Sequence, residues 1–511
     1  MTDKGQVYQY WDVTKDEEVE ADAVVVGSGA GGATVAAELA EGGLSVVVLE
    51  EGGAYDTKSF NGDAIQGIKR LYRDAGVGVI CGRPQILLAE GRCLGGSTVI
   101  NGGMSWRTPE RVLKRWEMEF AIPGLATGAM DPIFDRIEER IHVNIQAPDS
   151  LGGDDALLRL GAERLGFRLT PNRRNQSNCV GANNCAFGCP TGAKQSTLVS
   201  YLPRAAAFGA AIYTDCRVEQ VLLEPGASGR PRAVGVAGRL CDPKTQRPGP
   251  RLTVRARHTI LACGATQTPA LLLRNGIANS SGEVGRNFTV HPNAKCVGIF
   301  DEPVYGWRGV HQGHQVHEFL REGILIAIAF LPPQILALSL PFLGDELFDV
   351  MQALNRMVVA GALVEDTTAG TVRPGPFGMV RMRYDLTREN LAQLTQAVAL
   401  TAELLFAAGA RKVVVPVHGV APLQSPDDVQ TLYRAPIPPE DLEVVTVHPM
   451  GTCRMGADPT RCVVDPFGEA HDVRSLYVAD ASVLPTPIGV NPMLSIMGLA
   501  TRTALRVLGL V

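Results

Sequence analysis

The stretch "DAVVVGSGAGGATVAAELAEGGLSVVVLEEGG", residues 22–53, decides the fold of this chain. It opens with a short apolar run, passes through a glycine turn into a segment with helical apolar spacing, and ends in a second apolar run. Strand, tight turn, helix and strand within about 30 residues make a βαβ unit. The sequence therefore predicts an α/β fold with a Rossmann-like dinucleotide-binding domain.

The turn in this unit has the spacing Gly27-x-Gly29-x-x-Gly32. The first glycine permits a tight turn, the second lets the backbone approach a pyrophosphate, and the third lets the helix pack on the strand. The helix begins near Ala30 and turns its positive dipole end toward the phosphates. Glu50 ends the second strand, where it is placed to accept the ribose hydroxyls, and its charge disfavours the 2'-phosphate of NADP. The motif alone does not choose between NAD and FAD.

Two distant segments repeat the strand-then-helix pattern. They are "HTILACGA", residues 258–265, and "LYVADAS", residues 476–482, each followed by a helical apolar pattern. The dinucleotide-binding fold is therefore expected to be discontinuous, with a second α+β substrate-binding or cap domain inserted into it. The expected cofactor-binding ranges are 1–110, 195–295 and 440–511, and the expected cap ranges are 111–194 and 296–439.

Length and charge narrow the class of protein. A chain of 511 residues is expected to fold as two or three units, and 45% hydrophobic with 20% charged residues is a globular composition. The net charge of -5, without a dense Lys/Arg stripe, argues against nucleic-acid binding. The polar N-terminal segment has no apolar region typical of a secretory signal, so a cytoplasmic location is expected.

The uncharged segment "ILIAIAFLPPQILALSLPFL", residues 324–343, is long enough to span a membrane. Pro332 and Pro333 interrupt its hydrogen-bond ladder in the middle, where lipid offers no replacement partners. A buried strand, a turn and a helix are expected instead. An apolar substrate lid or a patch that touches a membrane stays open as a functional interpretation.

A second glycine-rich loop, "GRCLGGSTVINGG", covers residues 91–103 and offers backbone N–H groups and hydroxyls to a polar ligand. With this loop the sequence resembles the glucose-methanol-choline (GMC) oxidoreductase family of FAD enzymes. The resemblance implies that the loop lies along the pyrophosphate and the flavin. The residues that match the family's loop motif are Gly91, Arg92, Leu94, Gly95, Gly96, Ser97, Thr98 and Asn101.

The resemblance continues through "ILACGATQTPALLLRNGI" and "VGRNFTVHP" to the C-terminal block, which is most similar to the long-chain (fatty) alcohol oxidase branch. It implies that Val218 lies beside the adenine, and that Asp480 and Ala481 lie near the pyrophosphate and ribityl chain. Ile100 stands where some members have a histidine bonded covalently to the flavin. Non-covalent FAD is therefore implied.

Oxidation of an alcohol removes a hydroxyl proton and a hydride from the same carbinol. FAD accepts the hydride at N5, and a base near neutral pKa takes the proton, a task that suits imidazole. The motif "HPMGTCRMG" provides His448, which the resemblance places over the flavin, and "GVNPM" provides Asn491 to hold the hydroxyl oxygen. His291 and the histidines at 311, 314 and 317 are expected to be structural.

Three cysteines, Cys179, Cys185 and Cys189, lie in "CVGANNCAFGCPTGAK", residues 179–194. Three thiols on a glycine-rich loop, the last before a proline, suit an iron–sulfur cluster. Their spacing resembles a segment that holds a 3Fe-4S cluster in flavin subunits of bacterial sugar dehydrogenases. The whole block also resembles the long-chain alcohol oxidase branch, for which no cluster is implied. Cluster ligands and free thiols both stay open.

The sequence thus predicts an FAD-dependent oxidoreductase that acts on the CH–OH group of a small-molecule alcohol, with an apolar or long-chain substrate favoured. Its electron acceptor is either O₂ or a redox partner. Two alternatives remain: a dehydrogenase subunit whose iron–sulfur cluster passes electrons onward, and a lyase or decarboxylase on the same fold.

Overall fold

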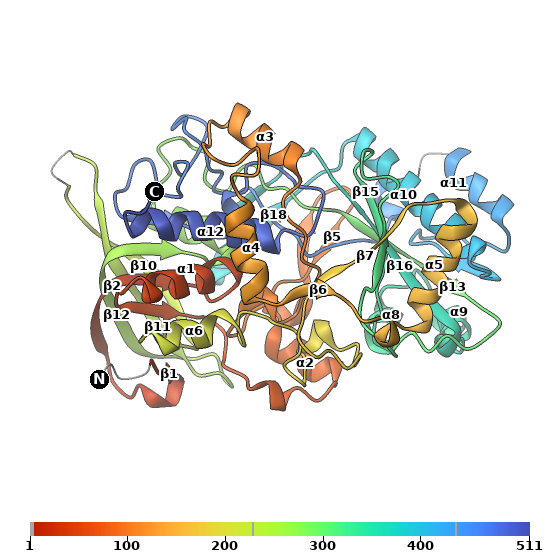
Figure 1. The fold of residues 1–511 in the computed structure, drawn as a ribbon, viewed down its shortest axis with the longest axis horizontal. Helices are drawn as coiled ribbons and strands as arrows, with labels where there is room; N and C mark the ends of the chain where they lie inside the picture. The colour runs from red at the N-terminus through yellow and green to blue at the C-terminus, as the bar shows by residue number, and fades with distance from the viewer. Residues whose placement is uncertain (1–4, 227–228, 435–436) are drawn as a thin grey trace.

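The computed structural model describes residues 5–226, 229–434 and 437–511. Within them the chain builds two large β-sheets, which lie toward opposite ends of the long axis of the molecule (Figure 1). A third, two-stranded sheet consists of β6 (Val143–Ile145) and β8 (Arg173–Asn175).

The first large sheet contains the predicted βαβ unit. Strand β2 pairs in parallel with β3 on one side and with β12 on the other, and β21 also pairs in parallel with β12. These strands read as continuous apolar runs because parallel strands are buried on both faces. In spatial order the strands are β1 (Val7–Tyr8), β9 (Ala211–Tyr213), β3 (Val46–Leu49), β2 (Glu17–Val26), β12 (Pro248–Leu261), β11 (Arg232–Cys241) and β10 (Cys216–Glu224), with β21 (Leu476–Val478) beside β12.

The second large sheet is mixed, and β13 lies in its centre between β20 and β16. Its strands in spatial order are β17 (Thr371–Pro374), β18 (Val380–Arg383), β4 (Gly78–Cys81), β5 (Ile86–Leu88), β20 (Val444–Thr446), β13 (Asn293–Ile299), β16 (Met357–Val364), β15 (Ile324–Ile328), β14 (His314–Val316) and β7 (Leu169–Pro171), with β19 (Lys412–Val414) also paired to β13.

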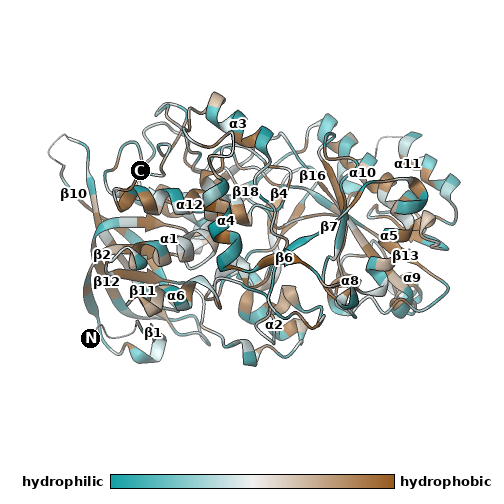
Figure 2. Cartoon of the chain, in the orientation of Figure 1, coloured by the Kyte–Doolittle hydropathy of each residue, from teal (hydrophilic) through white to brown (hydrophobic). Residues whose placement is uncertain are grey.

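Helices cover the faces of both sheets. The helices are α1 (Ala30–Glu41), α2 (Ala64–Leu71), α3 (Glu110–Glu119), α4 (Asp131–Arg140), α5 (Gly153–Leu165), α6 (Tyr201–Ala207), α7 (Gly264–Asn275), α8 (Pro333–Leu338), α9 (Gly344–Met351), α10 (Arg388–Ala407), α11 (Gln430–Arg434) and α12 (Met493–Val507). Helix α1 packs against α12 and α6 beside the first sheet, whereas α10 packs on β13 and β16 of the second. In Figure 2 α10 carries hydrophobic and hydrophilic residues together, as expected for a helix with one face on a sheet.

The two sheets have separate hydrophobic cores. The first core joins β2, β3 and β12 to α1 and α12, and it also takes in apolar side chains of α3 and α4. The second core joins β13, β15 and β16 to α10. The groove between two such units is the usual place for a cofactor site.

The predicted α/β fold with a Rossmann-like domain is confirmed, and the segment 324–343 contains the expected strand β15 and helix α8. Among the residues described, no helix has both the length and the apolar character needed to cross a bilayer. Strands β4, β5 and β20 lie in the ranges expected for the cofactor-binding domain, but they pair in the second sheet. The reason is a chain of pairings: β20 pairs with β13, β5 with β20 and β4 with β5. The domain boundaries themselves stay a prediction.

Candidate active site

The two glycine-rich loops, 60 residues apart in sequence, meet at the carboxyl end of β2. The hydroxyl of Ser28 accepts a hydrogen bond from the backbone N–H of Gly95 at 2.9 Å and donates to Glu50 Oε2 at 2.6 Å. The other oxygen of Glu50 accepts the N–H of Gly52 at 2.9 Å. A Cβ on Gly96 would lie 2.9 Å from the Cα of Gly29, so the loops touch at these two glycines. One buried hydroxyl therefore links both loops to the acidic residue.

Gly29 has open space where a side chain would stand. It is the N-cap of α1, its backbone is extended (φ -68°, ψ -163°), and no side chain caps the helix. Of the described glycines with an ordinary φ, Gly29 is the one whose added Cβ would meet no atom within 4 Å. The backbone conformation does not require glycine here. A ligand that approaches the free N–H groups of the helix does require it, because a side chain would occupy the same space. The residues present therefore fit the pyrophosphate of a dinucleotide.

The opposite side of α1 is closed by close packing. A Cβ on Gly31 would lie 1.7 Å from the carbonyl oxygen of Ala479, and a Cβ on Gly32 would lie 2.0 Å from that of Gly27. The next residue, Asp480, is buried, and its carboxylate accepts the N–H of Gly264 at 2.9 Å. The close packing brings Asp480 to the glycine turn, and the roles of Asp480 and Ala481 toward the cofactor stay a prediction.

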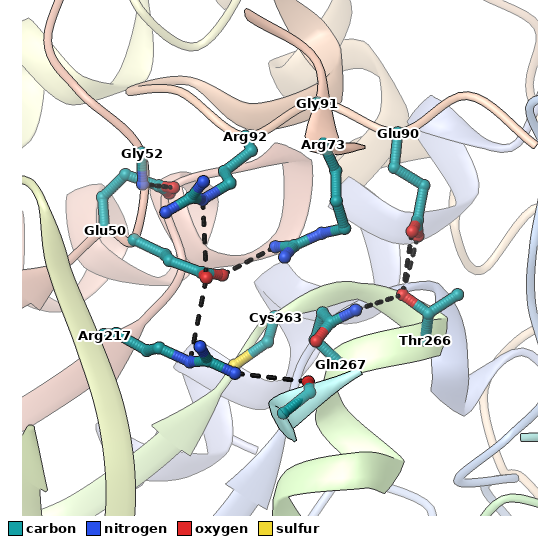
Figure 3. A network of polar contacts seen from close by, with 12 residues as sticks. Glu50, Gly52, Arg73, Glu90, Gly91, Arg92, Arg217, Cys263, Thr266 and Gln267 are labelled. Atoms are coloured by element: carbon teal, nitrogen blue, oxygen red, sulfur yellow. Dashed lines mark hydrogen bonds and ion pairs between the residues drawn. The ribbon is translucent and has the colours of Figure 1, made fainter. Parts of the chain in front are cut away.

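A partly exposed ion-pair network surrounds Glu51, the residue that follows Glu50. Figure 3 shows Arg73, Arg92 and Arg217 converging on one carboxylate, which belongs to Glu51, with N···O distances of 2.7, 3.4 and 3.9 Å. Burial acts to raise the pKa of Glu51, but the charges of Arg73 and Arg92 outweigh it and lower the pKa to about 2. Arg92, a predicted cofactor-binding residue, is thus paired with Glu51. Val218, the residue predicted to lie beside the adenine, directly follows Arg217 on β10.

The second loop reaches from the glycine turn to the other end of the site. Ser97 Oγ accepts the N–H of Gly91 at 3.0 Å and closes the loop. Asn101 Oδ1 accepts the N–H of Gly103 at 3.1 Å, and Asn101 Nδ2 lies 3.2 Å from the sulfur of Met493. Because Met493 follows Asn491 by two residues, the end of the loop lies close to the predicted catalytic asparagine.

The two predicted catalytic side chains are neighbours, and a third residue joins them. His448 Nε2 lies 3.5 Å from the side-chain nitrogen of Asn491, and His448 Nδ1 lies 3.2 Å from Nδ1 of His291. His291 Nε2 accepts backbone N–H groups of Ile488 at 3.4 Å and Gly489 at 3.2 Å. Neutral His291 therefore carries its proton on Nδ1 and donates to Nδ1 of His448, which favours the His448 tautomer protonated on Nε2. The contact with the amide nitrogen of Asn491 favours the other tautomer, because an amide nitrogen only donates and needs an unprotonated Nε2.

Burial keeps this histidine pair neutral. It lowers the pKa of His448 to about 4, and burial together with the charge of His448 lowers the pKa of His291 well below its usual value. His291 is 1% exposed. The expectation that His291 is only structural missed this contact. A signal was present in the sequence, since "VHP" occurs at residues 290–292 and again at 447–449.

The three clustered cysteines do not form a metal-binding group. Cys185 Sγ lies 3.3 Å from Nη2 of the buried Arg174, and Cys189 Sγ accepts the backbone N–H of Lys194 at 3.4 Å. In residues 5–226, 229–434 and 437–511, no three His, Cys, Asp or Glu side chains come together as metal ligands. The interpretation of Cys179, Cys185 and Cys189 as iron–sulfur ligands is therefore not supported. The groups at short range are the Arg174 guanidinium at Cys185, and the Lys194 backbone N–H and Thr191 hydroxyl at Cys189.

Comparisons with known proteins identify the family of this chain. The chain matches the FAD binding domain at residues 22–64 and the N- and C-terminal domains of the GMC oxidoreductases at 68–293 and 366–500. A GMC-type oxidoreductase of Mycobacterium tuberculosis is 39% identical over 95% of this chain and 75% of the relative. The long-chain-alcohol oxidase FAO1 of Arabidopsis thaliana is 29% identical over 96% of this chain and 67% of the relative. The crystal structure of pyridoxine 4-oxidase from Mesorbium loti superposes with a TM-score of 0.72 at 19% identity, covering 95% of this chain and 98% of the other.

The fold, the dinucleotide cradle and these matches define an FAD-dependent oxidoreductase that acts on CH–OH donors. The chain belongs to the GMC oxidoreductase family.

Proposed function

We propose that this enzyme oxidises the carbinol of an alcohol, with His448 as the acid–base residue and Asn491 as the group that holds the hydroxyl oxygen. The observation that carries the proposal is the pair of polar groups, 3.5 Å apart, at the end of the second glycine loop. Both side chains keep some accessible surface, so a small molecule has access to them. When FAD is bound, it supplies the hydride acceptor at its N5 atom.

The contact with His291 favours the His448 tautomer protonated on Nε2, whose N–H donates a hydrogen bond to the hydroxyl oxygen of the bound alcohol. To accept the hydroxyl proton at Nε2, His448 needs the tautomer that is protonated on Nδ1. That tautomer sets two N–H groups against each other across the 3.2 Å contact with His291. The lost hydrogen bond costs about 1–3 kcal/mol, and the hydrogen bond from Nδ2 of Asn491 to the unprotonated Nε2 offsets part of that cost. His291 is thus a positioning residue that acts on the tautomer of His448.

The cofactor contacts are part of the proposal. Gly27, Gly29, Ala30 and Gly32 lie along the pyrophosphate, and Glu50 accepts the adenosine ribose hydroxyls. The remaining cofactor-binding positions are Arg92, Gly95, Gly96, Ser97, Asn101, Val218, Asp480 and Ala481. FAD is held without a covalent bond, since the side chain of Ile100 is apolar and buried in a small hydrophobic cluster.

We infer that O₂ accepts the electrons. The relatives named as a long-chain-alcohol oxidase, a paromamine 6'-oxidase and a pyridoxine 4-oxidase are all oxidases, which supports this choice. An apolar part of the substrate is supported by Leu325 on β15 and Leu363 on β16, which are paired with each other and are directed away from the core under α10.

The test is anaerobic mixing of the FAD-loaded enzyme with a panel of aliphatic, aromatic and steroid alcohols, followed by exposure to air. Loss of the oxidised flavin absorbance with one class, and its return with hydrogen peroxide in air, is the expected result. If no alcohol bleaches the flavin, alcohol oxidation is excluded. If bleaching occurs but air does not restore the colour, the enzyme uses another electron acceptor.

A further inference from the structure

Lys295 lies on the face of the central strand β13 that is turned toward the active site. Side chains alternate along a strand, so Lys295 shares a face with Asn293 and, just before the strand, with His291. His291 contacts His448 directly. On the other face of β13, Ala294 and Cys296 are buried in the core that contains α10. Lys295 is therefore directed toward the side of the sheet on which the histidine pair lies.

The stem of this lysine and the side chain of Asn293 lie over a glycine of the neighbouring strand. Lys295 is paired with Gly361 on β16, and a Cβ on Gly361 would lie 3.5 Å from Cγ of Lys295 and 2.9 Å from Oδ1 of Asn293. Asn293 Oδ1 is buried without a hydrogen-bond partner. Lys295 keeps some accessible surface although β13 is paired along both edges, so a small molecule has access to it.

The charge of Lys295 has no counter-ion among the described residues. Its ammonium makes no hydrogen bond or ion pair there, whereas the neighbouring cations are held by other groups. Lys194 donates to the carbonyls of Val99, Asn101 and Cys185 at 2.6–2.8 Å, and Arg174 donates to the carbonyl of Gly102 at 2.9 Å.

These two cations and Lys295 all lie near His311. Burial, together with the three positive charges, lowers the pKa of His311 to about 3. No carboxylate pairs with any of the three within the described part of the chain. A cation that is largely removed from water without a partner is costly, so an anion at this place would relieve that cost. Burial lowers the pKa of Lys295 itself to about 8, which leaves it mainly charged at neutral pH.

We propose that Lys295 binds a carboxylate of the substrate, so that the enzyme oxidises a hydroxy acid whose hydroxyl and carboxylate are separated by an apolar spacer. This inference rests on the proposed function, since it assigns the carbinol end to His448 and Asn491. The Cα atoms of His291 and Lys295 are four residues apart on extended backbone, about 13 Å. Allowing for the length of the lysine, the spacer is on the order of four to eight carbons. The apolar side chains of Leu325 and Leu363 lie on the same face of the sheet.

The first experiment measures binding without turnover. Hexanoate and methyl hexanoate, which have no hydroxyl to oxidise, are titrated into the FAD-loaded enzyme by calorimetry. In Lys295→Met, which keeps the stem and removes the charge, hexanoate binding is expected to weaken by about 10- to 150-fold, the value of a hydrogen bond to a charged group. Methyl hexanoate binding is expected to stay unchanged, and Lys295→Arg is expected to restore part of the hexanoate affinity.

Lys412→Met is the matched control, because Lys412 is an exposed lysine on β19, which pairs with β13 in the same sheet. It is expected to bind hexanoate as the wild type does. Equal hexanoate affinity in Lys295→Met and the wild type would overturn the proposal. So would equal weakening of hexanoate and methyl hexanoate, since that result would mean that the substitution disturbs the site without removing a charge-specific contact.

The second experiment separates this inference from the proposed function. Flavin reduction by 6-hydroxyhexanoate is compared with reduction by 1-hexanol in the wild type and in Lys295→Met. A preference for the hydroxy acid that disappears in Lys295→Met supports both proposals. Reduction by 1-hexanol with no preference for the hydroxy acid overturns the role of Lys295 alone. Failure of both alcohols, with Lys295-dependent binding of hexanoate, refutes alcohol oxidation and supports the anion site.

Discussion

Replacement of Gly29 by alanine tests whether glycine is needed at this position for cofactor binding or for folding. The backbone of Gly29 is extended and its added Cβ would meet nothing within 4 Å, so the folded protein accommodates a methyl group there. Gly31, two residues later, is the opposite case, since its Cβ would lie 1.7 Å from a backbone carbonyl oxygen. The two variants add the same methyl group to the same helix, Ala30–Glu41.

The size of the effect follows from what the methyl group displaces. At Gly29 we expect the free energy of unfolding of the cofactor-free protein to change by less than about 1 kcal/mol, because the conformation suits alanine. The methyl group occupies the space that the pyrophosphate needs to reach the free N–H groups of the helix. Loss of one or two charge-assisted hydrogen bonds, at about 1.5–3 kcal/mol each, weakens FAD binding by about 10-fold to about 20,000-fold.

The assay has two readouts on each purified variant: the dissociation constant of FAD by fluorescence quenching, and the urea midpoint of the cofactor-free protein. Gly29→Ala should lose FAD and keep its midpoint, whereas Gly31→Ala should lower the midpoint because overpacking against backbone costs about 1–3 kcal/mol. If Gly29→Ala binds FAD within about threefold of the wild type, a spread that corresponds to less than 1 kcal/mol, the pyrophosphate does not lie at this helix end.

Four further outcomes are expected. His448→Ala should slow flavin reduction by about 10²–10⁴-fold while FAD stays bound, as stopped-flow absorbance would show. In the wild type the reduction rate should stay level between about pH 8 and 6 and fall only as the pH approaches about 4, since burial lowers the pKa of His448 to about 4 and the protonated ring cannot accept a proton; a transition near the ordinary histidine value would contradict this. Asn491→Leu should raise KM for the alcohol and lower kcat, and unchanged kinetics would remove it from the site. Ser28→Ala leaves Glu50 and the N–H of Gly95 without their partner, so it should lower unfolding free energy by about 1–3 kcal/mol, which urea titration measures.

Much of the fold could be read from local pattern. The unit at residues 22–53 is a continuous piece of chain whose strand, turn and helix signals all agree, and the structure forms it as β2, α1 and β3. The proline pair at 332–333 correctly indicated a strand, a turn and a helix in place of a membrane span. The expectation that two glycine loops share one ligand also has a physical basis in the structure, since Ser28 joins them.

What could not be predicted depends on pairing between distant segments. Strands β4 and β5 are short and join the second sheet through β20, a partner more than 350 residues away in sequence. His291 is one of nine histidines, and its role follows only from the neighbouring positions of β13 and β20. The cysteine loop suggested a cluster because spacing shows how close ligands lie in sequence but not where the thiols point. The side chain of Arg174 and the backbone N–H of Lys194 contact these thiols, and the spacing of the cysteines gives no sign of either contact.

The loop that carries Asn491 also controls the histidine pair. Residues 488 and 489 supply the two backbone N–H groups that fix the tautomer of His291, and Asn491 follows two residues later. Gly489 has a φ of +72°, and a Cβ there would lie 2.2 Å from a carboxylate oxygen of Glu365, which pairs with Arg111. The loop is therefore held in a conformation that only glycine adopts at low cost. Because one segment both donates backbone N–H groups to His291 and carries Asn491, the proposed function makes the tautomer of His448 depend on the same loop that would hold the alcohol.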